Sequence, residues 1–230
     1  MQQNYSNPNK DTKNRWWYSF YETWGPIIFT VLVYLGIRYY IAEARYIPSG
    51  SMRPGLRVND RLIVEKLSLL NRSPSRGEIV VFNSPYSFDK QLIATRQKQL
   101  PSSLKCAFVT FPLISWIPAL SERACDAYIK RVIAVEGDSL SINTNGSVFL
   151  NGRLLEEPYV EFFCPGEAEF NICRPISTTV PKGHVFVLGD NRANSWDSRF
   201  WPGGGFLPEK EIIGKAAWRF WPMNRFGKLN

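Results

Sequence analysis

The sequence is poor in histidine, with His184 as the only one among 230 residues. A Ser–His–Asp triad would depend on this single imidazole, and its place directly after Gly183 at the start of an apolar segment is typical of a surface histidine. The four cysteines include no C-x-x-C pair, which is the spacing that zinc sites commonly use. We therefore expect no metal ion and no cofactor, and a serine nucleophile in this chain would use an amine as its base.

The cysteines are even in number and lie in polar, loop-like sequence, which allows a disulfide framework. Pairs Cys106–Cys125 and Cys164–Cys173 would each close a short loop in an extracytoplasmic domain, but four cysteines allow three connectivities. Four reduced thiols in a reducing compartment are the alternative. The sequence alone leaves the pairing open.

The composition shows neither the bias of a disordered chain nor the motifs of a nucleic-acid-binding one. The hydrophobic fraction is 44% and the charged fraction 21%, which is ordinary for a folded protein. A net charge of +8 would suit nucleic acid or an anionic membrane surface. Because no zinc finger, RNA-recognition motif or basic helix is present, we expect a lipid membrane as partner and no nucleic acid.

One uncharged run, Pro26–Ile37, stands near the N-terminus. With its flanks the apolar stretch covers residues 24–42, and Arg38 interrupts it with a side chain long enough to reach the membrane interface. A spanning helix needs about 20 residues, so we predict one transmembrane anchor over residues 24–42. A cleavable signal peptide is the alternative, because residues 42–44 (AEA) resemble a cleavage site, whereas a buried core helix would need a polar face.

This anchor divides the chain into three expected parts. Residues 1–23 are a polar tail, of which we expect residues 1–15 to be disordered. The basic residues of the tail favour a cytoplasmic N-terminus, so residues 43–230 form the extracytoplasmic domain. Within that domain the proline-containing residues 83–127 show no clean periodicity and are predicted to be an irregular insertion.

Short apolar or β-branched segments separated by Gly, Pro and Asn turns predict a mainly β domain, an antiparallel sheet or pseudo-barrel, behind the transmembrane helix. The Asn-Gly pair at residues 145–146 predicts a hairpin turn, and residues 157–180 are expected to be rich in loops. The expected strands are residues 60–66, 78–82, 128–135, 139–142, 147–150, 184–188 and 212–220.

Two residues could form a nucleophile and its base. Ser51 follows the anchor in a glycine- and proline-rich turn, and Lys130 lies in an expected strand. Alternation in that strand puts Tyr128, Lys130, Val132 and Ala134 on one face, so the amine projects among apolar neighbours, and burial lowers a lysine pKa. Taken singly, Ser51 could be an ordinary turn serine and Lys130 a strand lysine reaching solvent, so their occurrence together carries the argument.

Four motifs in one order resemble the type I signal peptidases of bacteria, a family of membrane-anchored serine endopeptidases with a serine–lysine dyad. The motifs are P-S-x-S-M-x-P at residues 48–54, D-x-[LIV]-x-V-x-K at residues 60–66, a K-R strand ending in G-D at residues 130–138, and G-D-N-x-x-x-S-x-D-S-R at residues 189–199. The resemblance covers about residues 26–100 and 128–225 and is closest to cyanobacterial and plastid-type sequences. The resemblance is compatible with either the plasma membrane or the thylakoid membrane as the location of the protein.

The resemblance implies that Ser51 is the nucleophile and Lys130 the general base. It implies an oxyanion hole made of the Ser51 backbone N–H and the Ser49 hydroxyl. Ser195 would hold the lysine amine by a hydrogen bond, ion pairs would brace the site, and Met52 would pack beneath it. The residues of the two implied ion pairs are Asp190 with Arg131 and Asp197 with Arg199.

The resemblance also implies the reaction, removal of N-terminal signal peptides from exported preproteins after small residues at positions −1 and −3, through an acyl-enzyme and by a monomer. The alternative is an inactive membrane-anchored β domain that binds extracytoplasmic peptides. A second serine–lysine pattern, Ser102-x-x-Lys105, lacks the S-D-N and K-T-G partners of penicillin-binding proteins and is taken as chance. A self-cleaving repressor would need DNA-binding helices, and none is expected before the catalytic part.

Overall fold

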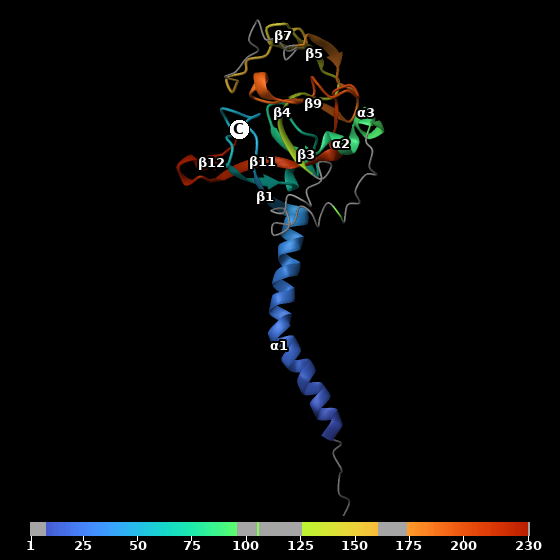
Figure 1. The fold of residues 1–230 in the computed structure, drawn as a ribbon, viewed down its shortest axis with the longest axis vertical. Coiled ribbons are helices and arrows are strands. Elements are labelled where there is room, and N and C mark those ends of the chain that lie inside the picture. The colour runs from blue at the N-terminus through green and yellow to red at the C-terminus, as the bar shows by residue number, and fades with distance from the viewer. Residues whose placement is uncertain (1–7, 96–104, 106–125, 161–173, 230) are drawn as a thin grey trace, which may run out of the picture. The chain divides into compact units, whose positions relative to one another are not determined.

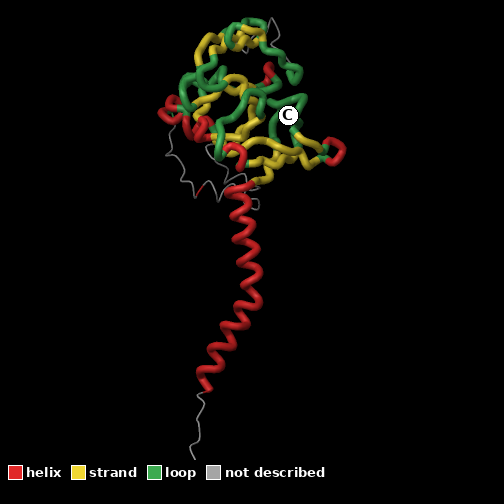
Figure 2. Tube along the Cα trace, turned by 180° about the vertical axis from the view of Figure 1, so that it is seen from behind, coloured by secondary structure: helices red, strands yellow, loops and turns green. Residues whose placement is uncertain are grey.

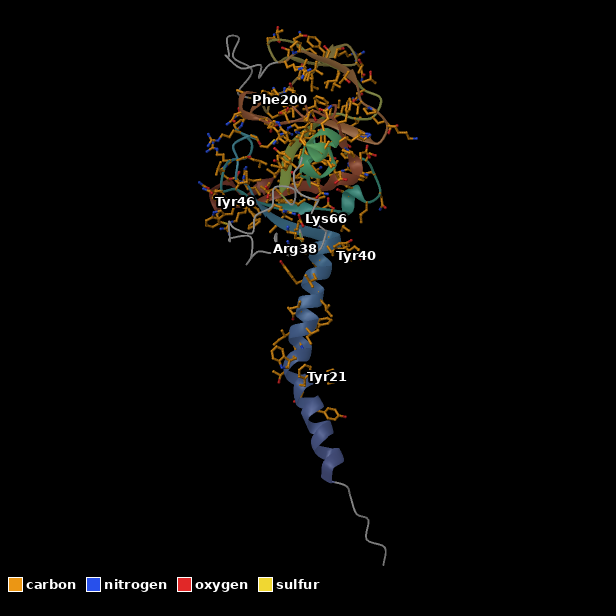
Figure 3. The ribbon with its side chains drawn as sticks, turned by 45° about the vertical axis from the view of Figure 1, so that its right-hand side comes forward. Tyr21, Arg38, Tyr40, Tyr46, Lys66 and Phe200 are labelled. Carbon is orange, nitrogen blue, oxygen red and sulfur yellow. The ribbon has the colours of Figure 1, made fainter. Side chains whose placement is uncertain are left out.

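The computed structural model describes residues 8–95, 105, 126–160 and 174–229, and the chain divides into two compact units, residues 1–43 and 44–230. In the first unit, α1 (Pro8–Gly36) continues as a π-helical turn (Ile37–Ile41). Residues Phe20–Ile41 are long and apolar enough to cross a membrane, judged by length and composition. The side chains of Tyr21 and Tyr40 are exposed on this helix (Figure 3).

The start of α1 corrects one prediction. Residues 8–15 are helical, so the expectation that residues 1–15 are disordered is wrong from Pro8 onward. A proline at the first position of a helix needs no hydrogen-bond partner for its nitrogen and has its φ already set. The polar residues that follow do not oppose a helix, although they give no periodic signal of one.

The second unit is built on an eight-stranded sheet in the order β1-β2-β11-β3-β4-β9-β10, with β12 paired to β11 (Figure 1). The pairs from β2 to β10 along this order are antiparallel. The strands are β1 (Ala42–Tyr46), β2 (Arg61–Glu65), β3 (Ile79–Asn83), β4 (Ala127–Ala134), β9 (His184–Leu188), β10 (Leu207–Pro208), β11 (Ile212–Trp221) and β12 (Gly227–Lys228).

A second, four-stranded antiparallel sheet has the order β7-β6-β5-β8. Its strands are β5 (Ser139–Ile142), β6 (Val148–Leu150), β7 (Arg153–Leu154) and β8 (Ile176–Thr179). Gly146 has a φ of +83°, which confirms the turn predicted from the Asn-Gly pair. The small sheet stands apart from the strands of the large one in Figure 1.

Short helical segments lie between the strands (Figure 2). Two of them, α2 (Pro85–Phe88) and α3 (Lys90–Ala94), fall in the stretch predicted to be irregular, so that prediction is wrong for residues 85–94. The Ser84 side chain accepts from the Tyr86 N–H, and the Asp89 carboxylate accepts from two backbone N–H groups of α3. Residues 96–104 and 106–125, which hold Cys106, Cys125 and Ser102, lie outside the described residues.

The core follows the two-residue period of the strands. In β3, Ile79 and Val81 pack in one apolar cluster, while Val80 and Phe82 pack in another on the opposite face. A strand buried on both faces explains why β3 reads as a continuous apolar run. The prediction of a mainly antiparallel β domain behind one N-terminal apolar helix is confirmed.

Candidate active site

Ser51 lies in the segment that joins β1 to β2. Backbone hydrogen bonds close the base of this segment, since the Ile47 N–H donates to Asp60 O at 2.9 Å and the Asn59 N–H donates to Ile47 O at 2.9 Å. Met52 is 1% exposed and packs in the apolar cluster of β2 and β3 with Leu56. Burial of Met52 in this cluster therefore holds the backbone of the preceding residue, Ser51, in place.

The same segment is held from the C-terminal part of the domain. The Arg225 guanidinium donates to both carboxylate oxygens of Asp60, at 2.9 and 3.1 Å, and to Gly55 O at 2.9 Å. Arg219 also donates to Gly55 O, at 2.9 Å. Asp60 begins the second motif of the resemblance, and its carboxylate ties the turn that carries Ser51 to these two arginines.

Lys130 lies in the middle of β4, opposite Val80 of β3. Its Nζ donates to Ser51 Oγ at 2.9 Å and to Ile129 O at 2.9 Å. Ser51 is 7% exposed and Lys130 4% exposed. The two residues are far apart in sequence, and the structure brings their reactive atoms into hydrogen-bonding distance in a site largely shielded from water.

Burial lowers the pKa of Lys130 to about 8, because the ammonium loses its hydration. The carboxylates of Asp197 and Asp190 act in the opposite direction, and Arg199 reinforces the lowering. A neutral amine can accept the serine proton, whereas an ammonium cannot. Near pH 8 about half of the Lys130 side chains would be in the form that a general base requires.

The apolar face predicted for Lys130 is only partly correct. Tyr128 and Val132 pack in the same apolar cluster, as expected from alternation. Ala134 belongs to a different cluster, because the register of β4 against β9 shifts between Val132 and Ala134. A register shift moves the following side chains relative to the pleat.

Three buried arginines near the dyad each pair with one buried carboxylate. Arg131 forms two hydrogen bonds of 2.8 Å to Asp190, and Arg199 donates to both oxygens of Asp197, at 2.8 and 3.0 Å. The structure thus contains both ion pairs that the resemblance implied, and it adds a third between Arg192 and Glu157. Each of these six side chains is at most 5% exposed.

This pairing has an electrostatic consequence for the base. With three guanidinium groups and three carboxylates, the buried charges of these pairs cancel, and among the described residues no carboxylate forms an ion pair with Lys130. A buried ammonium without its own counterion is disfavoured relative to the neutral amine. The arrangement therefore keeps the carboxylates at the site from holding the lysine charged.

The expected hydrogen bond from Ser195 to Lys130 is absent. Ser195 Oγ is buried and makes no hydrogen bond with the described residues. Its hydroxyl lies against Gly189, where a Cβ atom would come within 2.2 Å of Ser195 Oγ. Lys130 Nζ instead uses Ser51 Oγ and Ile129 O.

The resemblance also implied an oxyanion hole made of the Ser51 backbone N–H and the Ser49 hydroxyl. Ser49 Oγ lies 3.3 Å from Ser51 Oγ, with either atom able to donate. A hydroxyl at this distance can turn toward charge that develops on a carbonyl oxygen attacked by Ser51. The backbone carbonyl of Ser51 accepts a hydrogen bond from the Asn191 N–H at 3.0 Å.

Some residues of the site were not found from the sequence. Arg192 and Asn191 stand inside a quoted motif but received no role, whereas Glu157 and Tyr159 lie in a stretch expected to be loop. His184 lies at the start of β9, where its ring is within hydrogen-bonding distance of Lys182 O, and takes no part in the dyad. Cys164 and Cys173 lie outside the described residues, so the disulfide expectation stays a prediction.

Comparison with known proteins gives one consistent result. A family model described as "Signal peptidase, peptidase S26" matches residues 21–221. A signal peptidase I of Leptolyngbya laminosa is 41% identical over 87% of this chain and 79% of its own length. A probable signal peptidase I-2 of Synechocystis sp. is 39% identical over 88% of this chain and 74% of its own length. The chloroplastic thylakoidal processing peptidase 1 of Arabidopsis thaliana is 33% identical over 85% of this chain and 46% of its own length.

Proposed function

Because this chain belongs to the signal peptidase family, peptidase S26, we propose that Ser51 and Lys130 are the nucleophile and the general base of its reaction. The chain is a serine endopeptidase that removes signal peptides from preproteins. The alternative of an inactive peptide-binding domain has no support from the relatives. The observation that carries the dyad is the distance of 2.9 Å between Lys130 Nζ and Ser51 Oγ in a buried site.

The first step forms an ester. Neutral Lys130 takes the hydroxyl proton of Ser51 as Oγ attacks the scissile carbonyl carbon. The Ser51 backbone N–H and the Ser49 hydroxyl stabilise the oxygen that becomes negative, and this stabilisation is greatest in the transition state. The Lys130 ammonium then gives its proton to the leaving amine. The mature protein departs, and the signal peptide stays as an acyl group on Ser51, after a cut that follows small residues at −1 and −3.

In the second step Lys130 acts as the general base for a water molecule, which hydrolyses the ester on Ser51. Because this ester is an intermediate, a nucleophile that competes with water can test for it. Two preproteins with one signal peptide but different mature sequences should form the same acyl-enzyme. With hydroxylamine added in detergent, both should give the signal peptide hydroxamate and acid in an equal ratio, which mass spectrometry can measure. Product ratios that depend on the mature sequence, or cleavage without any hydroxamate, would contradict the ester on Ser51.

The pH dependence of cleavage follows from the pKa of Lys130. Since burial lowers this pKa to about 8, the fraction of neutral amine rises about tenfold per pH unit below 8 and levels off above it. We expect kcat/KM for a preprotein to be about 100-fold lower at pH 6 than on the plateau. Returning each sample to pH 8 before a second assay controls for unfolding. A flat profile between pH 6 and pH 9 would exclude Lys130 as the base.

The membrane orientation is part of the same proposal. The helix over Phe20–Ile41 serves as the anchor, with the N-terminus in the cytoplasm and the peptidase domain on the far side. Three basic residues before the span support this orientation, namely Lys10, Lys13 and Arg15. In sealed membranes that expose their cytoplasmic face, namely inverted plasma-membrane vesicles or intact thylakoids, added protease should leave the domain intact until detergent is added. Digestion of the domain in these sealed membranes would reverse the proposed topology.

A membrane surface also suits the exposed side chains of the second unit. Trp218, Trp221 and Phe226 are about half exposed, on or next to β11 and β12, and the Trp218 and Phe226 rings lie 5.9 Å apart. Exposed tryptophan beside basic residues is typical of contact with a membrane interface.

All groups assigned to the dyad and the oxyanion come from one chain, which supports a monomer as the working unit.

A further inference from the structure

The short segment after β7 carries a carboxylate that is buried without an obvious reason in the sequence. Glu157 is 4% exposed at its side chain, whereas its neighbours Glu156 and Pro158 are exposed. A carboxylate in such surroundings is costly unless it is paired and hydrogen-bonded. Glu157 meets both conditions through two residues, Arg192 and Tyr159.

Arg192 links Glu157 to the catalytic loop, which we define as residues 189–199. Two nitrogens of its guanidinium donate to the two carboxylate oxygens of Glu157, a bidentate arrangement. Its Nε donates to Gly189 O at 3.0 Å. The guanidinium is therefore oriented on one side by Glu157 and grips the first residue of the loop on the other.

Gly189 is the point where this loop meets the nucleophile. A Cβ atom at Gly189 would lie 2.6 Å from Ser51 O, so only a glycine allows the two backbones to approach this closely. The loop then donates the Asn191 N–H to the same Ser51 carbonyl at 3.0 Å. The Gly189 N–H is held by Asp197 at 3.0 Å. With its carbonyl held by Arg192, Gly189 is fixed at both ends of its backbone.

Tyr159 gives the same segment a second connection to the site. Its hydroxyl donates to Glu157 at 2.9 Å. The Arg131 guanidinium lies over its ring at 4.0 Å from the centroid, within the range of a cation–π contact. Arg131 follows the proposed base Lys130 in β4 and pairs with Asp190 of the catalytic loop. Residues 157–159 therefore contact two arginines close to the dyad, Arg192 through Glu157 and Arg131 through Tyr159.

We propose that Glu157 is a positioning residue for catalysis, which acts through Arg192 and Gly189 on the backbone of Ser51. This inference rests on the proposed dyad. Glu157 touches neither substrate nor the reacting atoms. Its function is to orient Arg192, so that the catalytic loop supports the Ser51 carbonyl and keeps Oγ aligned with Lys130. Misplacement of a reacting group by about 1 Å can lower a rate by about 100-fold.

The first test is Glu157→Gln in the full chain, with Glu156→Gln as a matched control at the exposed neighbour. The amide keeps the shape of the side chain but removes the charge that orients Arg192. We expect kcat for preprotein cleavage in detergent to fall about 10- to 100-fold and KM to change by less than about threefold, because the substrate contacts remain. Glu156→Gln should behave as the wild type. A wild-type kcat in Glu157→Gln overturns the proposal.

A second variant separates positioning from mere stability. Glu157→Gln leaves Arg192 as a buried unpaired charge and will lower the melting temperature. The double variant Glu157→Gln with Arg192→Met removes both charges, so its melting temperature should recover toward the wild-type value. Methionine cannot donate a hydrogen bond to Gly189 O as Arg192 does, so the kcat of the double variant should stay as low as that of Glu157→Gln. Recovery of kcat together with the melting temperature would show a structural role only and overturn the proposal.

The wild type and Ser51→Ala are assayed beside these variants. If the wild type does not cleave the preprotein, or if Ser51→Ala does, the proposed dyad fails independently of Glu157. If both behave as proposed and Glu157→Gln cleaves like Glu156→Gln, only the positioning role fails.

Discussion

Replacing Ser51 with alanine is expected to lower preprotein cleavage by at least about 10⁴-fold, because the acyl-enzyme cannot form without the hydroxyl. Ser51 Oγ is the atom held 2.9 Å from Lys130 Nζ. Any residual reaction would be direct attack by water, assisted by the groups that stabilise the oxyanion. The measurement is a single-turnover assay with enzyme in excess over a labelled preprotein in detergent, so that weak binding does not hide the chemical step.

The fold should tolerate this change, which permits a clean comparison. Alanine is smaller than serine, and Met52 and Leu56, which anchor the turn, are untouched. A matched control is Ser177→Ala, since Ser177 is exposed on β8 and should leave both cleavage and melting temperature unchanged. Cleavage by Ser51→Ala within about tenfold of the wild type would mean that another residue is the nucleophile.

The strands were largely predictable because their signal is local. In β3 and β9 a run of apolar residues that includes β-branched ones ends at an asparagine or a glycine, and the structure has strands at both places. β8 lies within residues 157–180, which were predicted to be rich in loops: Ile176–Thr179 is rich in β-branched residues, but the composition around it is typical of a loop. The helices α2 and α3 do carry a local signal, since Ser84 and Asp89 are N-cap residues and Pro85 begins α2.

The residues of the site could be predicted only where they belong to a recognisable motif. Ser51 and Lys130 were named from the resemblance together with the pKa argument, and their distance follows from the sheet, which no local pattern encodes. Glu157 had no sequence signal, since an acidic residue in an exposed loop normally faces water. Its partner Arg192 lies 35 positions away, and only the folded chain brings the two charges together. The predicted hydrogen bond of Ser195 is wrong for a similar reason, because its hydroxyl packs against Gly189, a contact that only the folded chain creates.

Changing Lys130 to methionine is expected to lower cleavage by about 10³-fold or more. Methionine has nearly the volume and length of lysine but no proton acceptor of comparable strength, so Ser51 Oγ keeps its proton at neutral pH. Arginine at this position should not restore activity, because its guanidinium stays protonated at any working pH. The assay is the one used for Ser51→Ala, run at pH 8 and pH 9. Substantial cleavage by either variant would assign the base to another group.

The same Lys130→Met change is expected to stabilise the fold at pH 6 to 7, although it removes activity. In the unfolded chain a lysine has a pKa of about 10.4, whereas burial lowers the pKa of Lys130 to about 8 in the fold. Below pH 8 the folded chain must hold a buried ammonium, so the whole penalty, on the order of 3 kcal/mol, is present.

As the pH rises from 8 to about 10.4 the unfolded chain keeps its proton and the folded chain has lost it, so the wild-type disadvantage disappears. Loss of the hydrogen bonds to Ser51 and Ile129 offsets about 1 kcal/mol of the gain. Melting temperatures in detergent should therefore be higher for Lys130→Met at pH 6.5 and should converge or cross above pH 10. A variant that melts below the wild type at pH 6.5 would show that the buried amine is not under electrostatic stress, and the physical basis of its role as a base would be lost.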